Sequence, residues 1–229
     1  MLVKKYSPNK LDALRVNPSR WSRKLRYTHL IVDEVGGPVD DKDIELLEKQ
    51  LGCALPDDYT AFIRACNGGY LEYSILVEFE NGKSEYLSFC SLYKVHGEGD
   101  WECNPFELRH EWEGDELPPG KVLPIARDGG SSRLYLDLRE GYKVAAYVQG
   151  LPEWTGLQKK DSLVVLADSF DEYLGKLTIS DESIQYHVKN FDVSENSIRE
   201  TLKWLDSMGT GWRRKYREIW NERILSHKI

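Results

Sequence analysis

The residues of this chain that could do chemistry are mostly carboxylates, and many of them lie in one short stretch. Between residues 98 and 116, with Arg109 as the one basic residue, the acids are Glu98, Asp100, Glu102, Glu107, Glu111, Glu113, Asp115 and Glu116. Trp101 and Trp112 are interspersed among them. Clustered charge speeds the encounter with an oppositely charged protein, and buried aromatic anchors hold it afterwards. The stretch predicts a surface that binds a basic protein; the alternative is a solvated acidic loop that serves solubility.

Arrangements that would indicate catalysis or metal binding are weak. His96, Cys103 and His110 are seven residues apart, which fits no common zinc pattern. The sequence has no Gly-x-Ser-x-Gly elbow and no His-Glu-x-x-His motif. The remaining histidines, His187 among them, are isolated in the sequence, and we expect them to be solvated or at the edge of the core. We therefore expect a protein that is not an enzyme and uses no metal and no cofactor.

The net charge of −7 conceals a strong asymmetry along the chain. Residues 1–29 carry eight bases against one acid, whereas residues 30–180 carry 14 bases against 29 acids. The excess of acids in residues 30–180 repels the phosphate backbone of nucleic acids, which argues against a nucleic acid as the partner. Bases interleaved with Trp21, Tyr27, Trp212 and Tyr216 could still bind RNA or DNA. Alternatively, they dock onto the acidic middle of the same chain or of a second copy in a homo-oligomer.

Hydropathy and cysteine content indicate in which cellular compartment the protein resides. The longest apolar run, residues 163–167, is far shorter than the roughly 20 residues of a membrane-spanning helix. The N-terminus has no apolar segment of the kind that a secretory signal requires. Four cysteines without a Cys-x-x-Cys pair are too few for a disulfide scaffold. We expect a cytoplasmic protein that does not span a membrane.

The periodicity of apolar residues predicts helices, then strands, then helices. Two short helices, over residues 43–51 and from Pro56 to Cys66, form a corner that Asn67-Gly68-Gly69 ends. Residues 73–79 alternate as a strand with one buried face, and Asn81-Gly82 turns the chain into a returning strand over residues 86–95. Further antiparallel strands are expected over residues 122–126, 134–138 and 144–148, and helices from residue 168 and over residues 184–191, 198–205 and 212–224.

The order of these motifs resembles the SUKH superfamily, which includes the Smi and Knr proteins. The residues that carry the resemblance are Leu55, Pro56, Tyr59, Phe62, Asn67, Gly68, Gly69, Asp128, Gly129 and Gly130. We interpret them as turn, cap and core residues. Asp128-Gly129-Gly130 could cradle an anion through its backbone amides, but without a following Lys-Ser or Lys-Thr a hairpin turn is the simpler interpretation.

The resemblance covers residues 40–177 and implies an α+β fold, a mainly antiparallel sheet with helices packed against it. It also implies a non-catalytic immunity protein that neutralises a cognate polymorphic toxin, often a nuclease, or else a regulatory or scaffold protein of the cell-wall-regulator type. Residues 1–39 then form a basic N-terminal arm, and residues 178–229 form a C-terminal helical extension.

Overall fold

The computed structural model describes residues 24–78, 82, 84–95, 122–130, 132–139, 141–147 and 164–226 of the chain. Its elements, in chain order, are β1 (Leu25–Tyr27), β2 (Leu30–Val32), α1 (Asp41–Leu51), α2 (Asp57–Cys66), β3 (Gly69–Tyr70), β4 (Ser74–Glu78), β5 (Ser84–Leu87), β6 (Ser91–Leu92), β7 (Val122–Arg127), β8 (Arg133–Asp137), β9 (Lys143–Tyr147), β10 (Val164–Ala167), α4 (Phe170–Lys176), β11 (Leu177–Thr178), α5 (Asp181–Asn190), α6 (Glu195–Ser207) and α7 (Trp212–Leu225). No helix in these ranges is both long and apolar enough to cross a bilayer.

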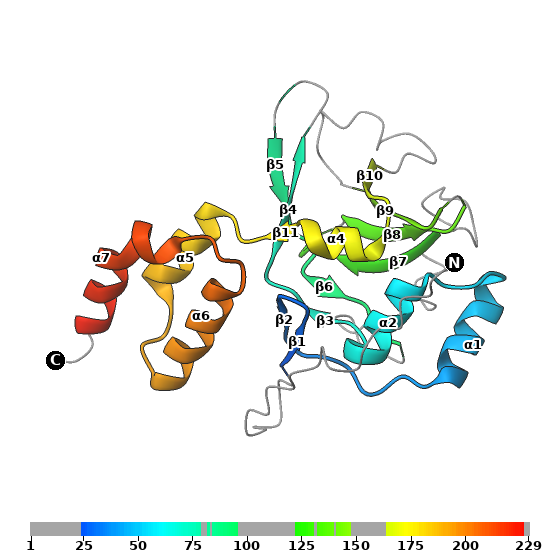
Figure 1. Cartoon of the computed structure of the whole chain (residues 1–229), viewed down its shortest axis with the longest axis horizontal. Coiled ribbons are helices and arrows are strands. Elements are labelled where there is room, and N and C mark those ends of the chain that lie inside the picture. The colour runs from blue at the N-terminus through cyan, green and yellow to red at the C-terminus, as the bar shows by residue number, and fades with distance from the viewer. Residues whose placement is uncertain are drawn as a thin grey trace, which may run out of the picture.

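The strands form antiparallel sheets, so the α+β prediction is confirmed. The largest sheet has the order β10-β9-β8-β7-β6-β3, and a smaller one has the order β11-β4-β5. The β1–β2 hairpin joins the larger sheet through a bridge in which Asp33 and Tyr70 exchange both backbone hydrogen bonds, at 2.9 and 2.7 Å. Figure 1 shows α1, α2 and α4 beside the larger sheet and α5, α6 and α7 together at the opposite end of the molecule.

The predicted helical corner is present, with its caps. Asp40 begins α1 through a capping box with Asp43. The left-handed conformation of Gly52, with φ +74°, ends α1. Pro56 is the N-cap of α2 rather than its first residue, because its ψ of 141° is still extended. The apolar stripe of α2 is buried as predicted, and Phe62 packs edge-on against Tyr27 with ring centroids 5.2 Å apart.

One strand prediction is wrong. The returning strand over residues 86–95 is two strands, β5 and β6, which belong to different sheets. Between them, Ser88 Oγ donates to the Tyr73 carbonyl at 2.9 Å, and the Cys90 carbonyl accepts from the Leu71 amide at 2.8 Å. These bonds hold the chain as it crosses from one sheet to the other, which local periodicity does not reveal.

The middle strands of the larger sheet are buried on both faces. Leu134, Tyr135 and Leu136 are all buried, although the sequence alternation suggested a single inward face. Ala145, opposite Tyr135 on β9, is buried as well. The sheet is therefore the centre of the core and not an outer layer.

The C-terminal helices, by which we mean α5, α6 and α7, have their own aromatic core. Phe191 stacks on Trp220 with ring centroids 4.2 Å apart, and Trp212 meets Trp220 edge-on at 5.2 Å. Of the two residues that the sequence offers as the cap of α6, Asp192 and Ser194, the structure uses Ser194. All three rings are buried, so the predicted stripes of these helices face one another.

Candidate functional site

The acidic segment and its neighbours lie outside the described residues. This applies to the eight acids and two tryptophans of residues 98–116 and to His96, Cys103 and His110. The role of the acids and tryptophans in binding a partner stays a prediction, and so does the expectation that His96, Cys103 and His110 bind no metal. In the part of the chain that is described, no three His, Cys, Asp or Glu side chains come together as metal ligands would.

The Asn67-Gly68-Gly69 motif ties three segments together. The Asn67 amide nitrogen donates to the carbonyls of Gly37 and Val95, at 2.8 and 3.1 Å, and its amide oxygen accepts from the Val95 backbone at 2.7 Å. Asn67 is buried, and these bonds satisfy its polar atoms. Gly68, with φ +67°, leaves so little space that a Cβ would overlap the Tyr93 carbonyl. The motif therefore needs these residues for architecture.

The Asp128-Gly129-Gly130 motif forms a turn. Asp128 Oδ1 accepts from the backbone amides of Gly130, at 2.7 Å, and Ser132, at 3.1 Å. These two amides already have a carboxylate partner within the turn. This geometry is that of an Asx turn at a hairpin and not that of an open anion cradle.

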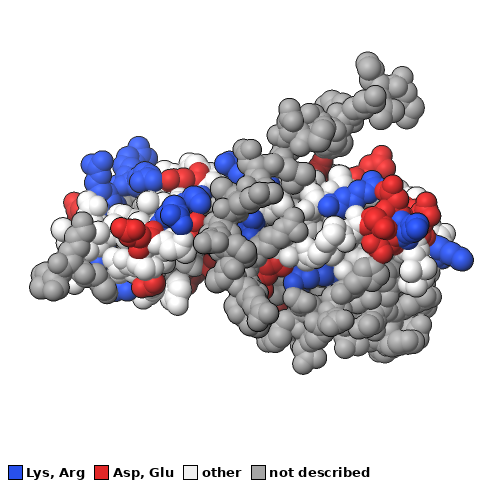
Figure 2. Space-filling view, turned by 90° about the horizontal axis from the view of Figure 1, so that it is seen from below, with Lys and Arg blue, Asp and Glu red and all other residues white. Residues whose placement is uncertain are grey.

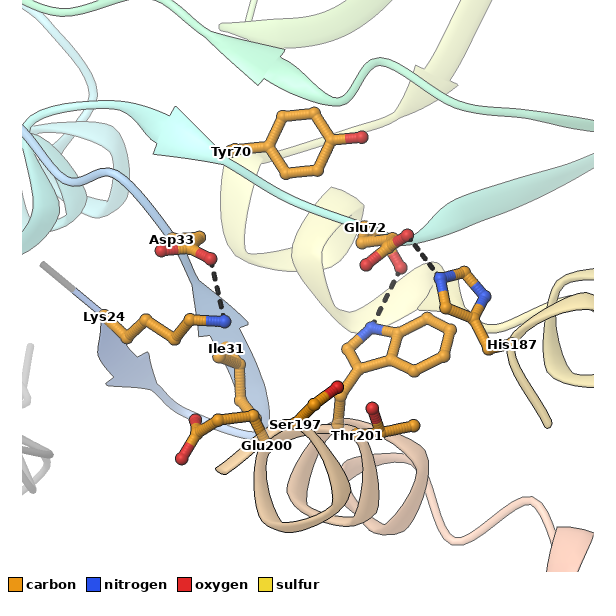
Figure 3. A pocket seen from close by; sticks show the side chains of 10 residues that line it. Lys24, Ile31, Asp33, Tyr70, Glu72, His187, Ser197, Glu200 and Thr201 are labelled. Atoms are coloured by element: carbon orange, nitrogen blue, oxygen red, sulfur yellow. Dashed lines mark hydrogen bonds and ion pairs between the residues drawn. The ribbon is translucent and has the colours of Figure 1, made fainter. Parts of the chain in front are cut away.

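A groove that the sequence did not predict lies where the C-terminal helices meet the β1–β2 hairpin and β3 (Figure 3). This junction groove has a volume of about 240 Å³. One wall consists of Lys24, Ile31, Asp33, Tyr70 and Glu72, and the other of His187, Ser197, Glu200, Thr201 and Trp204. Residues far apart in the sequence thus bring charged groups and hydroxyls together in this groove.

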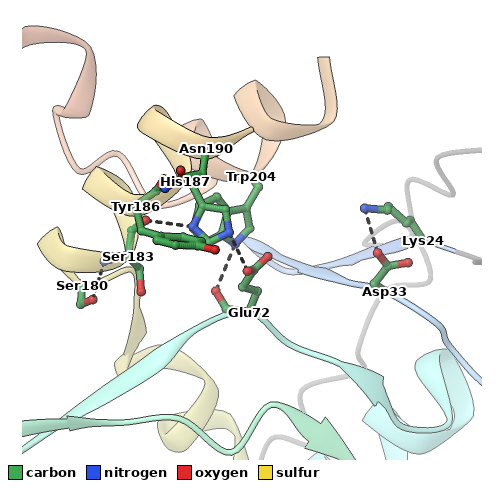
Figure 4. Close-up of polar contacts among 9 residues, drawn as sticks. All are labelled: Lys24, Asp33, Glu72, Ser180, Ser183, Tyr186, His187, Asn190 and Trp204. Carbon is green, nitrogen blue, oxygen red and sulfur yellow. Dashed lines mark hydrogen bonds and ion pairs between the residues drawn. The ribbon is translucent and has the colours of Figure 1, made fainter. Parts of the chain in front are cut away.

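His187 and Glu72 form an ion pair across this junction (Figure 4). His187 Nε2 lies 2.7 Å from Glu72 Oε1, and Nδ1 lies 2.8 Å from the Ser183 carbonyl. Both partners are acceptors, so the imidazolium, with a proton on each ring nitrogen, is the form of His187 that satisfies both contacts. Burial opposes that charge, but Glu72 and the Ser183 carbonyl outweigh it and raise the pKa of His187.

Two further hydrogen bonds join the same short segment to α6. Trp204 Nε1 donates to the Glu72 carbonyl at 3.1 Å. The Tyr73 hydroxyl lies 3.0 Å from Ser207 Oγ and accepts from the Ile31 amide at 3.0 Å. The dipeptide Glu72-Tyr73 therefore connects the β1–β2 hairpin, α5 and α6.

The charges around the junction groove are balanced. Lys24 Nζ pairs with Asp33 at 2.8 Å, and Glu200 accepts from Lys203 at 3.0 Å. Burial, with Cys90, Glu72 and Glu34 nearby, raises the pKa of Tyr70 to about 12, so its hydroxyl keeps its proton. The groove thus offers paired charges and hydroxyls suited to polar recognition. It does not bring a nucleophile together with an activating base, as a catalytic site would.

The basic helix α7 finds its described partners among the C-terminal helices. Arg213 makes a two-pronged contact with Asp206, with Nη2 2.5 Å from Oδ2, and Lys215 lies 2.6 Å from Asp181. Figure 2 shows Lys and Arg gathered at the end of the molecule that these helices occupy. Arg213 and Lys215 thus pair with acids of the C-terminal helices themselves. Docking of this helix onto the acidic middle of the same chain or of a second copy stays a prediction.

Sequence reasoning missed the junction groove for a simple reason. His187 is isolated from other histidines in the sequence, so we expected it to be solvated or at the edge of the core, although it lies between Ile184 and Val188 on α5. Glu72, however, is 115 positions earlier, and nothing in the sequence connects the two. The polar residue on an otherwise apolar stripe was the one available signal.

The family model described as SMI1 / KNR4 family (SUKH-1) matches residues 38–176, more than half of the chain. No curated protein matches the chain. The C-terminal helices follow the matched region.

Proposed function

Because the chain belongs to the SMI1 / KNR4 (SUKH-1) family, we propose that it is a non-catalytic protein that binds and neutralises a cognate polymorphic toxin. The family match over residues 38–176 is the observation that carries this proposal. The family contains immunity and regulatory proteins, which are generally not enzymes. The toxin would be met in the cytoplasm, where a toxin that enters the cell acts.

We further propose that the partner is a basic protein, such as a nuclease domain, and that residues 98–116 bind it. A nuclease must be basic around its active site to hold phosphates, so an acidic protein can occlude that site. The acids of this segment outnumber its bases eight to one. Trp101 and Trp112 would supply the anchors that bury apolar area after the encounter.

One observation favours a second candidate, a regulatory or scaffold protein of the cell-wall-regulator type. The C-terminal helices lie beyond the matched region and have their own aromatic core. We propose residues 1–39, 40–177 and 178–229 as the arm, the family domain and the extension of the chain. An extension of this kind gives a regulator a further surface for assembly. A toxin gene beside the gene of this chain would favour immunity, and its absence would favour the scaffold.

The toxin hypothesis can be tested by surface plasmon resonance against the inactivated toxin domain encoded next to this chain, at two salt concentrations. Charge reversal of Glu111, Glu113 and Asp115 to Lys should slow association and reduce its salt dependence. Trp112→Ala should instead speed dissociation, because an anchor acts after the encounter.

The matched control reverses three exposed acids elsewhere, in the variant E45K/E218K/E222K, which changes the net charge by the same amount. If the control slows association as much as the segment variant does, net charge and not residues 98–116 attracts the partner. Absence of any binding by the wild-type protein would contradict the toxin hypothesis itself. Circular dichroism verifies that each variant is folded.

A further inference from the structure

The β4–β5 hairpin has one buried face and one exposed face. On β4, Ile75 and Val77 point into the core and are buried, which anchors the hairpin. On the other face, Leu76 and Tyr86 lie directly opposite each other on the paired strands. Each of them is 46% exposed. Two large apolar side chains paired on a solvent face add little to the core, and an exposed apolar patch is typical of an interaction site.

The hairpin also has an open edge. Within the described residues, β5 pairs with β4 alone and ends the order β11-β4-β5. Figure 1 shows the hairpin rising away from the larger sheet. Its outer edge therefore carries backbone amides and carbonyls of residues 84–87 that can pair with an added strand.

The charge around the apolar pair is negative. Glu78 ends β4 on the same face as Leu76 and Tyr86, whereas Glu85 lies opposite Val77 and therefore on the other face of the hairpin. Both side chains are exposed. Neither carboxylate has an ion-pair partner in the part of the chain that is described. Over residues 74–87 the sequence carries three acids against Lys83. A guest strand along β5 would therefore meet Glu78 beside the apolar pair and Glu85 on the other face, two carboxylates that have no ion-pair partner among the described residues.

We infer that the β4–β5 hairpin is a docking surface for an extended segment of a basic protein, which adds as a strand to β5 and covers Leu76 and Tyr86. Backbone pairing supplies affinity, and the alternate side chains supply selectivity. Glu78 and Glu85 select a basic partner over a second copy, because like charges brought together across a strand pair are destabilising. The inference rests on the proposed function, since it states where the basic partner makes contact.

The test variant is L76T/Y86T, which removes the apolar pair but keeps residues with high strand propensity. The matched control is V165T, because Val165 is a similarly exposed apolar residue on β10, which ends the strand order of the other, larger sheet. Both are measured by surface plasmon resonance against the inactivated toxin domain encoded beside this chain. Hydrogen exchange of the wild-type complex measures directly whether the backbone amides of β5 become protected when the partner binds.

We expect L76T/Y86T to lose at least tenfold in affinity, mainly through faster dissociation, while V165T stays within about twofold of wild type. The amides of residues 84–87 should become protected in the complex. E78K/E85K should slow association, and it serves as the second variant if L76T/Y86T does not fold. These results would support the docking surface.

Each contrary result has a distinct meaning. If the wild-type protein binds and both hairpin variants bind equally well, the hairpin is not the docking surface, while the proposed function still holds. If the wild-type protein does not bind the toxin domain, the proposed function fails, and this inference fails with it. The remaining possibility is that a second copy of this chain covers the hairpin, and sedimentation of the protein alone tests it. If the wild-type protein is a dimer and L76T/Y86T is a monomer, the face binds a second copy, and the inference of a basic partner is wrong.

Discussion

Replacement of His187 by Gln tests how the C-terminal helices are held to the rest of the protein. The imidazolium joins α5 to Glu72 and to the Ser183 carbonyl through two charge-assisted contacts. Glutamine is of similar length and its amide nitrogen can still donate hydrogen bonds, but it carries no charge. The variant therefore removes the cation while leaving most of the packing against Trp204, whose ring centroid lies 4.5 Å from that of His187.

The expected cost follows from the exposure of the pair. A hydrogen bond to a charged group contributes about 1.5–3 kcal/mol when buried, whereas exposed ion pairs contribute at most about 1 kcal/mol. The side chain of His187 is 25% exposed and that of Glu72 is 46% exposed, so solvent screens the pair substantially. We expect the free energy of unfolding of His187→Gln to fall by about 1 kcal/mol at pH 6.

The pH dependence has a definite sign. The pKa of His187 is raised in the folded protein above its ordinary value of 6.5. The folded state therefore binds this proton more tightly than the unfolded state does. The stabilisation is fully present below pH 6.5 and is lost as the pH rises through the raised pKa. Wild type and His187→Gln should thus differ in stability at pH 6 and converge at alkaline pH.

The assay is urea unfolding of both proteins at a series of pH values, together with a histidine NMR titration. The difference between the two proteins removes the contribution of His29, whose pKa burial and Arg26 lower. Glu72→Gln keeps an acceptor at the same place but removes the carboxylate, so it should lower the pKa of His187. A stability difference that stays constant with pH, or a His187 that titrates at 6.5 or below, would refute the reasoning.

Two further predictions concern the family region. Phe62→Ala should cost about 3–5 kcal/mol in urea unfolding, because Phe62 is buried between Tyr27 and Phe170; a loss below about 1 kcal/mol would contradict the packing. Gly68→Ala should destabilise by about 1–3 kcal/mol, whereas Gly52→Ala has the same sign of φ but open space around it and should cost less. Equal melting temperatures for the two glycine variants would show that the close approach of the Tyr93 carbonyl to Gly68 does not add to the cost of the substitution.

The features that the sequence predicted are those that depend on neighbouring residues. Apolar residues three and four apart placed Tyr59, Phe62 and Cys66 on the buried face of α2. Gly52 marked the end of α1 for an equally local reason, the left-handed conformation that glycine adopts without strain. The cap of α6 at Ser194 follows from a hydroxyl that satisfies a free amide.

The features that the sequence could not predict depend on distant residues. The break between β5 and β6 is held by Ser88 and Cys90, whose partners lie in the segment that precedes β4. The alternation in β8 was ambiguous, because Tyr135 can face either solvent or a second apolar layer. The spacing of apolar residues alone does not distinguish a strand with one buried face from a strand with two.

The junction groove depends on the same kind of long-range contact. Glu72 accepts from Trp204 through its backbone and from His187 through its side chain, so the C-terminal helices bind both of its polar ends. Tyr73 is tied to Ser207 on α6 and to Ile31 on β2. Strand β4 begins directly after Glu72 and Tyr73. The contacts that α5 and α6 make with these two residues therefore also fix the start of β4, whose outer face carries Leu76. A partner that covers the β4–β5 hairpin should therefore bind less tightly once His187 loses its proton, and His187→Gln should abolish that pH dependence.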